Sequence, residues 1–215
     1  MRVNFPAPGS PSRMTLLVNH PQRKDLRERL ERNIVLRRLK KRAFDEIEQH
    51  LAIIDYRKGD VLLSQGAHDM EQYFVLDGIL KRVVASPEGK EMILRFAAED
   101  DMDTSYAAWK LRTPAPYSIR CVTKARVAKL ALPQWAAFLE RHPDLKDDFE
   151  YEVMRLMSEI MAHTITLHLL DAPGRVRRFF RKHAELADHI PKKELAAYLN
   201  LAAETLSRLK QQGKI

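Results

Sequence analysis

The chain has 215 residues, enough for one large or two modest domains, and its 37 Lys and Arg against 29 Asp and Glu give a net charge of +8. This excess favours a polyanionic partner, either nucleic acid or an acidic membrane surface. Cys121 is the single cysteine, which excludes an internal disulfide and any metal or iron–sulfur site held by several thiolates of one chain. No apolar run reaches the roughly 18 residues of a membrane span. We therefore expect a soluble protein of the reducing cytoplasm, without membrane contact.

Residues 1–22 begin with a stretch rich in proline, glycine and serine that lacks the apolar segment of a signal peptide. We expect a disordered tail, within which Met14 is an alternative start. Residues 23–51 carry many charges around spaced apolar positions, which predicts short surface helices.

From Tyr56 onward, short β-branched and aromatic runs alternate with turn residues, which predicts an antiparallel β-domain within residues 23–143. Its clearest hairpin is YFVLDGILKRVV, residues 73–84, because Asp-Gly supplies the positive φ angles of a two-residue turn. Strands near 91–98, 117–122 and 126–132 complete the domain.

A helix is predicted to begin near Pro133 and a longer one to span residues 144–170. The long helix carries a heptad seam with one polar member, formed by Phe149, Val153, Leu156, Ile160, His163, Leu167 and Leu170. This seam predicts pairing with a second copy of the chain, the alternative being a core helix of a monomer. A second apolar stripe, at Met154, Met157, Met161 and Ile165, predicts packing on the helix's own β-domain as well.

Residues 171–215 predict a separate helical domain that starts with Asp171 as an N-cap and Pro173 in the first turn. Its small core is expected to comprise Val176, Phe179, Phe180, Leu195, Leu199, Leu206 and Leu209. Two helices separated by Asn200-Leu201-Ala202 have helix-turn-helix spacing, and Asn tolerates the left-handed backbone that such a turn requires.

The second helix of this motif enters the major groove of DNA. We expect Glu204, Ser207 and Arg208 to read base edges, because Glu accepts from cytosine and Arg donates two hydrogen bonds to guanine. Lys192, Lys193 and Thr205 are the expected phosphate contacts. The alternative is that Glu204 and Arg208 are only an i,i+4 pair on a solvated helix face.

Three segments in this order resemble the bacterial cyclic-AMP receptor protein and FNR regulators, the Crp/Fnr family, over roughly residues 35–215. KGDVLLSQG with YFVLDGILK resembles the family's β-roll, LDAPGR its hinge, and KKELAAYLNLAAETLSRL its DNA-binding helices. The resemblance implies an α+β fold, with an N-terminal antiparallel β-roll (a cyclic-nucleotide-binding-like jelly roll), a dimerisation helix over 144–170 and a helix-turn-helix domain. It also implies that Glu204, Ser207 and Arg208 read a TTGAT-like inverted repeat, as in the FNR branch.

The chain departs from the family at its nucleotide pocket. Thr104-Ser105 and Ala115-Pro116 stand where the family has its ribose and phosphate anchors, so we expect no cyclic AMP. Any effector pocket would use Arg112, Arg120, Ile160 and Met161. The cysteines of FNR are absent, which excludes its iron–sulfur cluster. Although His68 lies on a β-roll loop, we expect no haem and no metal site. Compared with the family pattern, we also expect the helix-turn-helix domain to lack most or all of the C-terminal β-hairpin wing.

These patterns predict a homodimeric, sequence-specific transcription regulator whose partners are double-stranded DNA, a second copy of the chain and, as a further candidate, RNA polymerase. The alternative is a ligand-binding or protein-interaction module of the same fold with a vestigial DNA-binding domain. No constellation of catalytic residues favours an enzyme.

Overall fold

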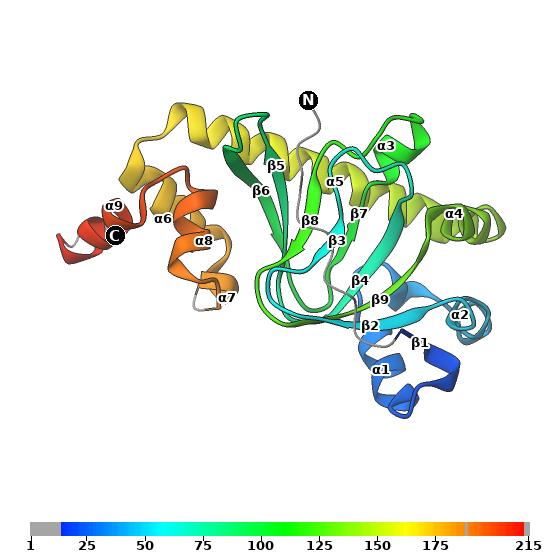
Figure 1. Cartoon of the computed structure of the whole chain (residues 1–215). Helices are drawn as coiled ribbons and strands as arrows, with labels where there is room; N and C mark the ends of the chain where they lie inside the picture. Colours follow the sequence, from blue (N-terminus) through cyan, green and yellow to red (C-terminus); the bar gives the residue numbers. More distant parts are fainter. Residues whose placement is uncertain (1–13, 188, 213–215) are drawn as a thin grey trace.

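Two antiparallel sheets are formed by strands between residues 15 and 131, and the described chain from Leu132 onward is helical (Figure 1). The computed structural model describes residues 14–187 and 189–212. One sheet has five strands in the order β1 (Thr15–Leu16), β2 (Ala52–Tyr56), β9 (Ala125–Ala131), β4 (Glu71–Asp77) and β7 (Met102–Thr104). The other has four, in the order β3 (Val61–Leu63), β8 (Ser118–Cys121), β5 (Leu80–Ala85) and β6 (Glu91–Ala97). Apolar side chains of both sheets fill one core between them, which is the expected β-roll.

The segment before the roll is ordered from residue 14 onward. Thr15 and Leu16 pair with Ile53 and Ala52 of β2, and Leu17 is fully buried at 0% exposure. The prediction of disorder is therefore wrong for residues 14–22, because this segment extends the five-stranded sheet; residues 1–13 lie outside the described part of the chain. Short helices follow as predicted, at η1 (Leu17–Asn19), α1 (Arg23–Leu30), η2 (Leu36–Arg38) and α2 (Lys41–Glu48).

The predicted hairpin at Asp77-Gly78 is also wrong. β4 pairs with β7 and β9, whereas β5 pairs with β6 and β8, so the Asp-Gly turn carries the chain from one sheet to the other. Gly78 is required there, because its φ is +84° and an added Cβ would lie 2.2 Å from the carbonyl oxygen of Lys124. The true hairpin joins β5 to β6 through Gly89, whose φ is +82°.

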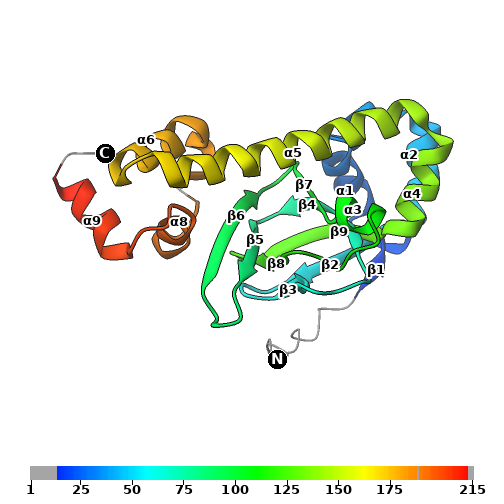
Figure 2. The ribbon, with the colours of Figure 1, turned by 90° about the horizontal axis from the view of Figure 1, so that it is seen from above.

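A short helix, α3 (Tyr106–Lys110), lies between β7 and β8, and two helices follow β9: α4 (Leu132–Arg141) and α5 (Pro143–Leu169). α4 carries its proline in the first turn, as predicted, and its Trp135 contacts Phe74 of the sheet and Phe149 of α5 edge-on, at 5.5 and 5.3 Å between ring centroids. Figure 2 shows α5 running along one side of the roll and on to the C-terminal helices.

The heptad seam of α5 faces its own chain. Phe149 is 0% exposed, Leu156 1% and Val153 8%, all packed in the core of the roll, and Leu167 is 9% exposed. These side chains are therefore not available to a partner. The predicted dimer seam is wrong for these buried members; as predicted, it comprised Phe149, Val153, Leu156, Ile160, His163, Leu167 and Leu170. The physical reason is that the β-roll, which the heptad pattern cannot reveal, covers this face first.

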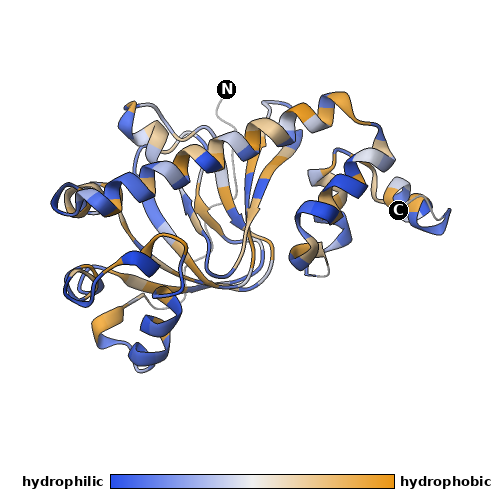
Figure 3. Cartoon of the chain, turned by 180° about the vertical axis from the view of Figure 1, so that it is seen from behind, coloured by the Kyte–Doolittle hydropathy of each residue, from blue (hydrophilic) through white to orange (hydrophobic). Residues whose placement is uncertain are grey.

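The second stripe of α5 is the exposed one. Met154 is 63% exposed, Met161 65% and Ile165 49%, and they continue the heptad spacing that starts at Tyr151, which is 61% exposed. Apolar segments recur along α5 up to its C-terminal end (Figure 3). Among residues 14–187 and 189–212, no helix is long and apolar enough to cross a membrane.

The C-terminal helices are α6 (Ala172–Lys182), α7 (Ala184–Ala187), α8 (Lys192–Tyr198) and α9 (Ala203–Gln211). Asp171 caps α6 as predicted, because its carboxylate accepts from the Gly174 amide at 2.8 Å. The predicted core forms with Val176 and Phe179 of α6 and the leucines of α8 and α9, all below 9% exposure. Phe180 is the exception, with 42% of its surface exposed.

Candidate nucleic-acid interface

A sharp turn sets α9 against α8. Asn200 has a φ of 51°, the left-handed conformation predicted for this position, and the Leu201 amide donates to the Ala196 carbonyl at 2.9 Å. The turn lets Leu206 and Leu209 of α9 pack against α8 with 7% exposure each. The local sequence therefore fixes which face of α9 is buried and which is free.

The free face of α9 carries the three predicted base-reading residues. Glu204, Ser207 and Arg208 are exposed and lie three and four positions apart on one side of the helix. Within the described part of the chain, Glu204 and Arg208 form no ion pair with each other or with any other residue, so their charged groups are available to a ligand. Such a face can present donors and acceptors to the edges of bases.

Lysines flank this reading face. Lys192 and Lys193 are exposed at the start of α8, and Thr205 is half-buried in the first turn of α9. These positions suit contacts to phosphate rather than to bases, because the side chains lie beside the reading face rather than on it.

A basic helix that the sequence analysis left out also belongs to this domain. α6 has the sequence APGRVRRFFRK, with five cations in 11 residues. Arg177 and Arg181 are exposed on its outer side, whereas Arg175 and Arg178 are partly buried against α5. The cluster of arginines directly after the predicted hinge is the sequence feature that indicates this basic helix.

The helix-turn-helix is docked on its own β-roll and on α5. The ring of Tyr198, at the end of α8, stacks on His163 of α5 at 3.8 Å and 1° between planes, and meets Phe96 of β6 at 5.1 Å. Beside it, Lys81 of β5 donates to Glu194 of α8 at 2.7 Å, a pair with only 12% and 21% of the side chains exposed. Both contacts hold the orientation of α8, and with it that of α9.

Burial determines the protonation state of His163, whose ring stacks on Tyr198. Desolvation lowers the pKa of His163 from 6.5 to about 4, with a smaller contribution from the positive charges of His183 and Lys182. Burial likewise lowers the pKa of His183. His163 is therefore neutral at neutral pH, the form that stacks on Tyr198 without a desolvated charge.

The interior of the β-roll is occupied by an ion pair. Arg82 of β5 and Asp103 of β7, both 0% exposed, meet with Nε donating to Oδ1 at 2.6 Å. A second guanidinium nitrogen donates to the Thr104 carbonyl at 3.0 Å, and the group lies 4.6 Å from the centre of the Tyr117 ring. Arg82 thus lies beside Thr104, the residue at the position of the family's ribose anchor.

The residues predicted for an effector pocket lie on three different parts of the fold: the turn after α3, β8 and α5. Arg112 is exposed on a turn with a φ of 57°. Arg120 lies on β8, and its guanidinium donates a hydrogen bond to the Glu91 carboxylate at 2.6 Å. Met161 is 65% exposed on α5, while Ile160 is half-buried one position away. The turn after α3 thus exposes Arg112 to solvent, and a shared pocket for Arg112, Arg120, Ile160 and Met161 stays a prediction.

Comparison with known proteins identifies the parts of this architecture. Residues 53–142 match the cyclic nucleotide-binding domain family. The cAMP-activated global transcriptional regulator CRP of Salmonella typhimurium is 21% identical over 170 residues, which cover 74% of this chain and 81% of CRP. The nitrogen fixation regulation protein FixK of Bradyrhizobium diazoefficiens is 23% identical over 166 residues, which cover 72% of this chain and 68% of FixK.

The fold is similar to that of a solved regulator as well. The c-di-GMP responsive global regulator CLP of Xanthomonas campestris superposes with a TM-score of 0.67 at 13% identity, covering 81% of this chain and 92% of CLP. The chain is homologous to CRP and FixK, which are Crp/Fnr regulators. The names of both relatives, CRP and FixK, describe regulators. Within this Crp/Fnr architecture, α5 connects the β-roll to the helix-turn-helix formed by α8 and α9.

Proposed function

We propose that the chain is a sequence-specific DNA-binding transcription regulator that acts as a homodimer on an inverted repeat, without control by cyclic AMP. The observation that carries the proposal is the free face of α9, where Glu204, Ser207 and Arg208 are exposed and unpaired within the described residues. The resemblance to the FNR branch supports a TTGAT-like half-site. A bidentate contact between Arg208 and guanine would fix at least one G·C pair in it.

The dimer uses the exposed stripe of α5. Met154, Met161 and Ile165 expose apolar surface at heptad spacing, and an apolar stripe of this kind is stabilised by burial against a second copy of itself. Two parallel copies of α5 would place two recognition helices on one side of the assembly, as a two-fold symmetric DNA site requires.

Independence from cyclic AMP rests on the interior of the roll. Arg82 and Asp103 occupy the space beside Thr104, and Ala115 and Pro116 supply no cation for a phosphate. Displacing Arg82 would leave Asp103 as a buried, unpaired charge, which costs several kcal/mol. The ion pair therefore takes the place of a ligand and holds β5 to β7.

Selection of binding sites from random DNA tests the proposal. The purified protein should enrich an inverted repeat whose half-sites lie about one helical turn apart, centre to centre. Enrichment of no motif, combined with dimerisation in solution, would favour a protein-interaction module with a vestigial DNA-binding domain.

A further inference from the structure

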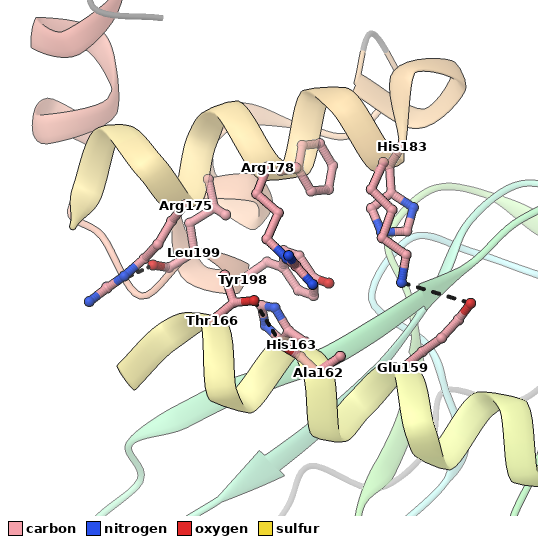
Figure 4. A pocket seen from close by; sticks show the side chains of 11 residues that line it. Glu159, Ala162, His163, Thr166, Arg175, Arg178, His183, Tyr198 and Leu199 are labelled. Carbon is pink, nitrogen blue, oxygen red and sulfur yellow. Dashed lines mark hydrogen bonds and ion pairs between the residues drawn. The ribbon is translucent and has the colours of Figure 1, made fainter. Parts of the chain in front are cut away.

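A cleft lies between α5 and α6, where the C-terminal domain meets the long helix. Figure 4 shows its lining: His163 and Glu159 come from α5, Arg175 and Arg178 from α6, and Tyr198 of α8 lies between the two helices beside His163. The cleft is narrow, with a free volume of about 20 Å³, and it opens to solvent. A molecule bound there would touch both the long helix and the DNA-binding domain.

Positive charge dominates this cleft. Arg175, Arg178 and Lys182 line it from α6, and Glu159 is the one carboxylate among its lining residues. Glu159 is already engaged, because it accepts from Arg155 at 2.8 Å and lies 3.8 Å from Lys182. One shared carboxylate cannot neutralise the three cations that line the cleft.

Hydrogen-bonding groups in the cleft lack partners. Arg178 is partly buried, yet its guanidinium makes no hydrogen bond or ion pair with another residue of the described ranges 14–187 and 189–212. Within the same ranges, Nε2 of His163 is also buried without a hydrogen-bond partner. Arg175, by contrast, donates to the carbonyls of Leu170 and Leu199 at 2.8 and 3.2 Å and so closes one end of the cleft. Unused donors beside unneutralised charge are the features of an anion site.

We propose that this cleft binds a small anion carrying a phosphate group, held by the guanidinium of Arg178 and the ammonium of Lys182. A guanidinium meets a phosphate through two parallel N–H···O bonds, and Lys182 adds a point charge from the next turn of the same helix. The phosphate would replace solvent beside Arg178 and reduce the repulsion among the cations of α6. The remainder of the ligand extends through the open side of the cleft.

Such an anion would act as an effector. It would join α6 to α5 and so stabilise the docked orientation of the helix-turn-helix that Tyr198 and Lys81 already favour. The ligand is distinct from the DNA backbone, because Arg178 and Lys182 line the cleft toward α5, whereas Arg181 lies on the exposed side of α6.

The test uses inorganic phosphate as the probe and the thermal midpoint of the full chain as the readout. About 10 mM phosphate is compared with sodium chloride of the same ionic strength, so that general salt effects cancel. Arg178→Ala removes the main donor, and Lys182→Met is a second variant in case the first does not fold. Arg181→Ala is the matched control, because it removes a charge from the same helix outside the cleft.

We expect phosphate to raise the midpoint of the wild type and of Arg181→Ala, and the affinity of Arg178→Ala to fall at least about tenfold. An equal response of all variants, or no response of the wild type beyond that to chloride, would overturn the proposal. Lys192→Ala separates this site from the DNA face: loss of the response in that variant alone would place the phosphate on the DNA face and also overturn it. The readout involves the protein alone, so its failure leaves the proposed DNA reading untouched.

Discussion

The stacked rings of His163 and Tyr198 make the stability of the folded chain depend on pH. Burial holds the pKa of His163 at about 4, against an ordinary value of 6.5. Because the pKa is lower in the folded chain, the unfolded chain takes up this proton first as pH falls. The contribution of neutral His163 is therefore fully present above about pH 6.5 and is lost as pH falls toward about 4.

The size of this loss follows from the two pKa values. Between about pH 7.5 and about pH 5, linkage gives a decrease of about 2 kcal/mol in the free energy of unfolding from His163 alone, and the whole shift corresponds to about 3 kcal/mol. The positive charges of His183 and Lys182 act in the same direction, since each makes a protonated His163 less favourable.

The replacement His163→Phe isolates this contribution, because a phenyl ring still stacks on Tyr198 but carries no proton. Urea unfolding of both proteins at the two pH values should show a loss that is about 2 kcal/mol larger in the wild type. His183 is present in both proteins, so its own titration cancels in the comparison. Equal losses in the two proteins would refute the assignment of a depressed pKa to His163.

Three further outcomes follow from the structure. The double replacement Met154→Glu and Met161→Glu should convert a dimer into a monomer, as measured by light scattering. Leu111→Glu should leave the dimer unchanged, because Leu111 is 74% exposed but lies outside the stripe. Isothermal titration calorimetry should detect no binding of cyclic AMP or cyclic GMP, and micromolar affinity for either would contradict an interior filled by Arg82. Arg82→Met should cost about 3–5 kcal/mol in urea unfolding, and adding Asp103→Leu should restore much of it, because the loss comes from leaving one buried charge unpaired.

The turn and cap positions of the C-terminal domain could be predicted from the sequence because their causes are local. Asp171 caps the helix that begins next to it, and Asn200 adopts the left-handed backbone that the turn between two helices demands. Short-range backbone chemistry decides both, so neither depends on which distant segment packs nearby. The order β-roll, long helix and helix-turn-helix followed from similar local patterns.

The features that the sequence predicted wrongly depend on distant partners. Phe149 and Met154 lie on two apolar faces of one helix, and only the position of the β-roll decides which face is covered. Asp77-Gly78 has the chemistry of a hairpin turn, but the flanking strands find partners in different sheets. The sequence around Arg82 indicates only a strand, because its ion pair with Asp103 forms only when the fold brings β5 and β7 together.

The central claim is that α9 reads DNA bases, and the most direct measurement compares Arg208→Ala with Lys192→Ala on the DNA site enriched by selection. Arg208→Ala should cost roughly 1–3 kcal/mol per half-site and relax selectivity at one G·C pair. Glu204→Ala should do the same at the cytosine from which it accepts. Lys192→Ala should weaken binding to all sequences about equally and make the salt dependence less steep by roughly one ion. The same uniform loss for Arg208→Ala and Lys192→Ala, with no inverted repeat from selection, would contradict the claim.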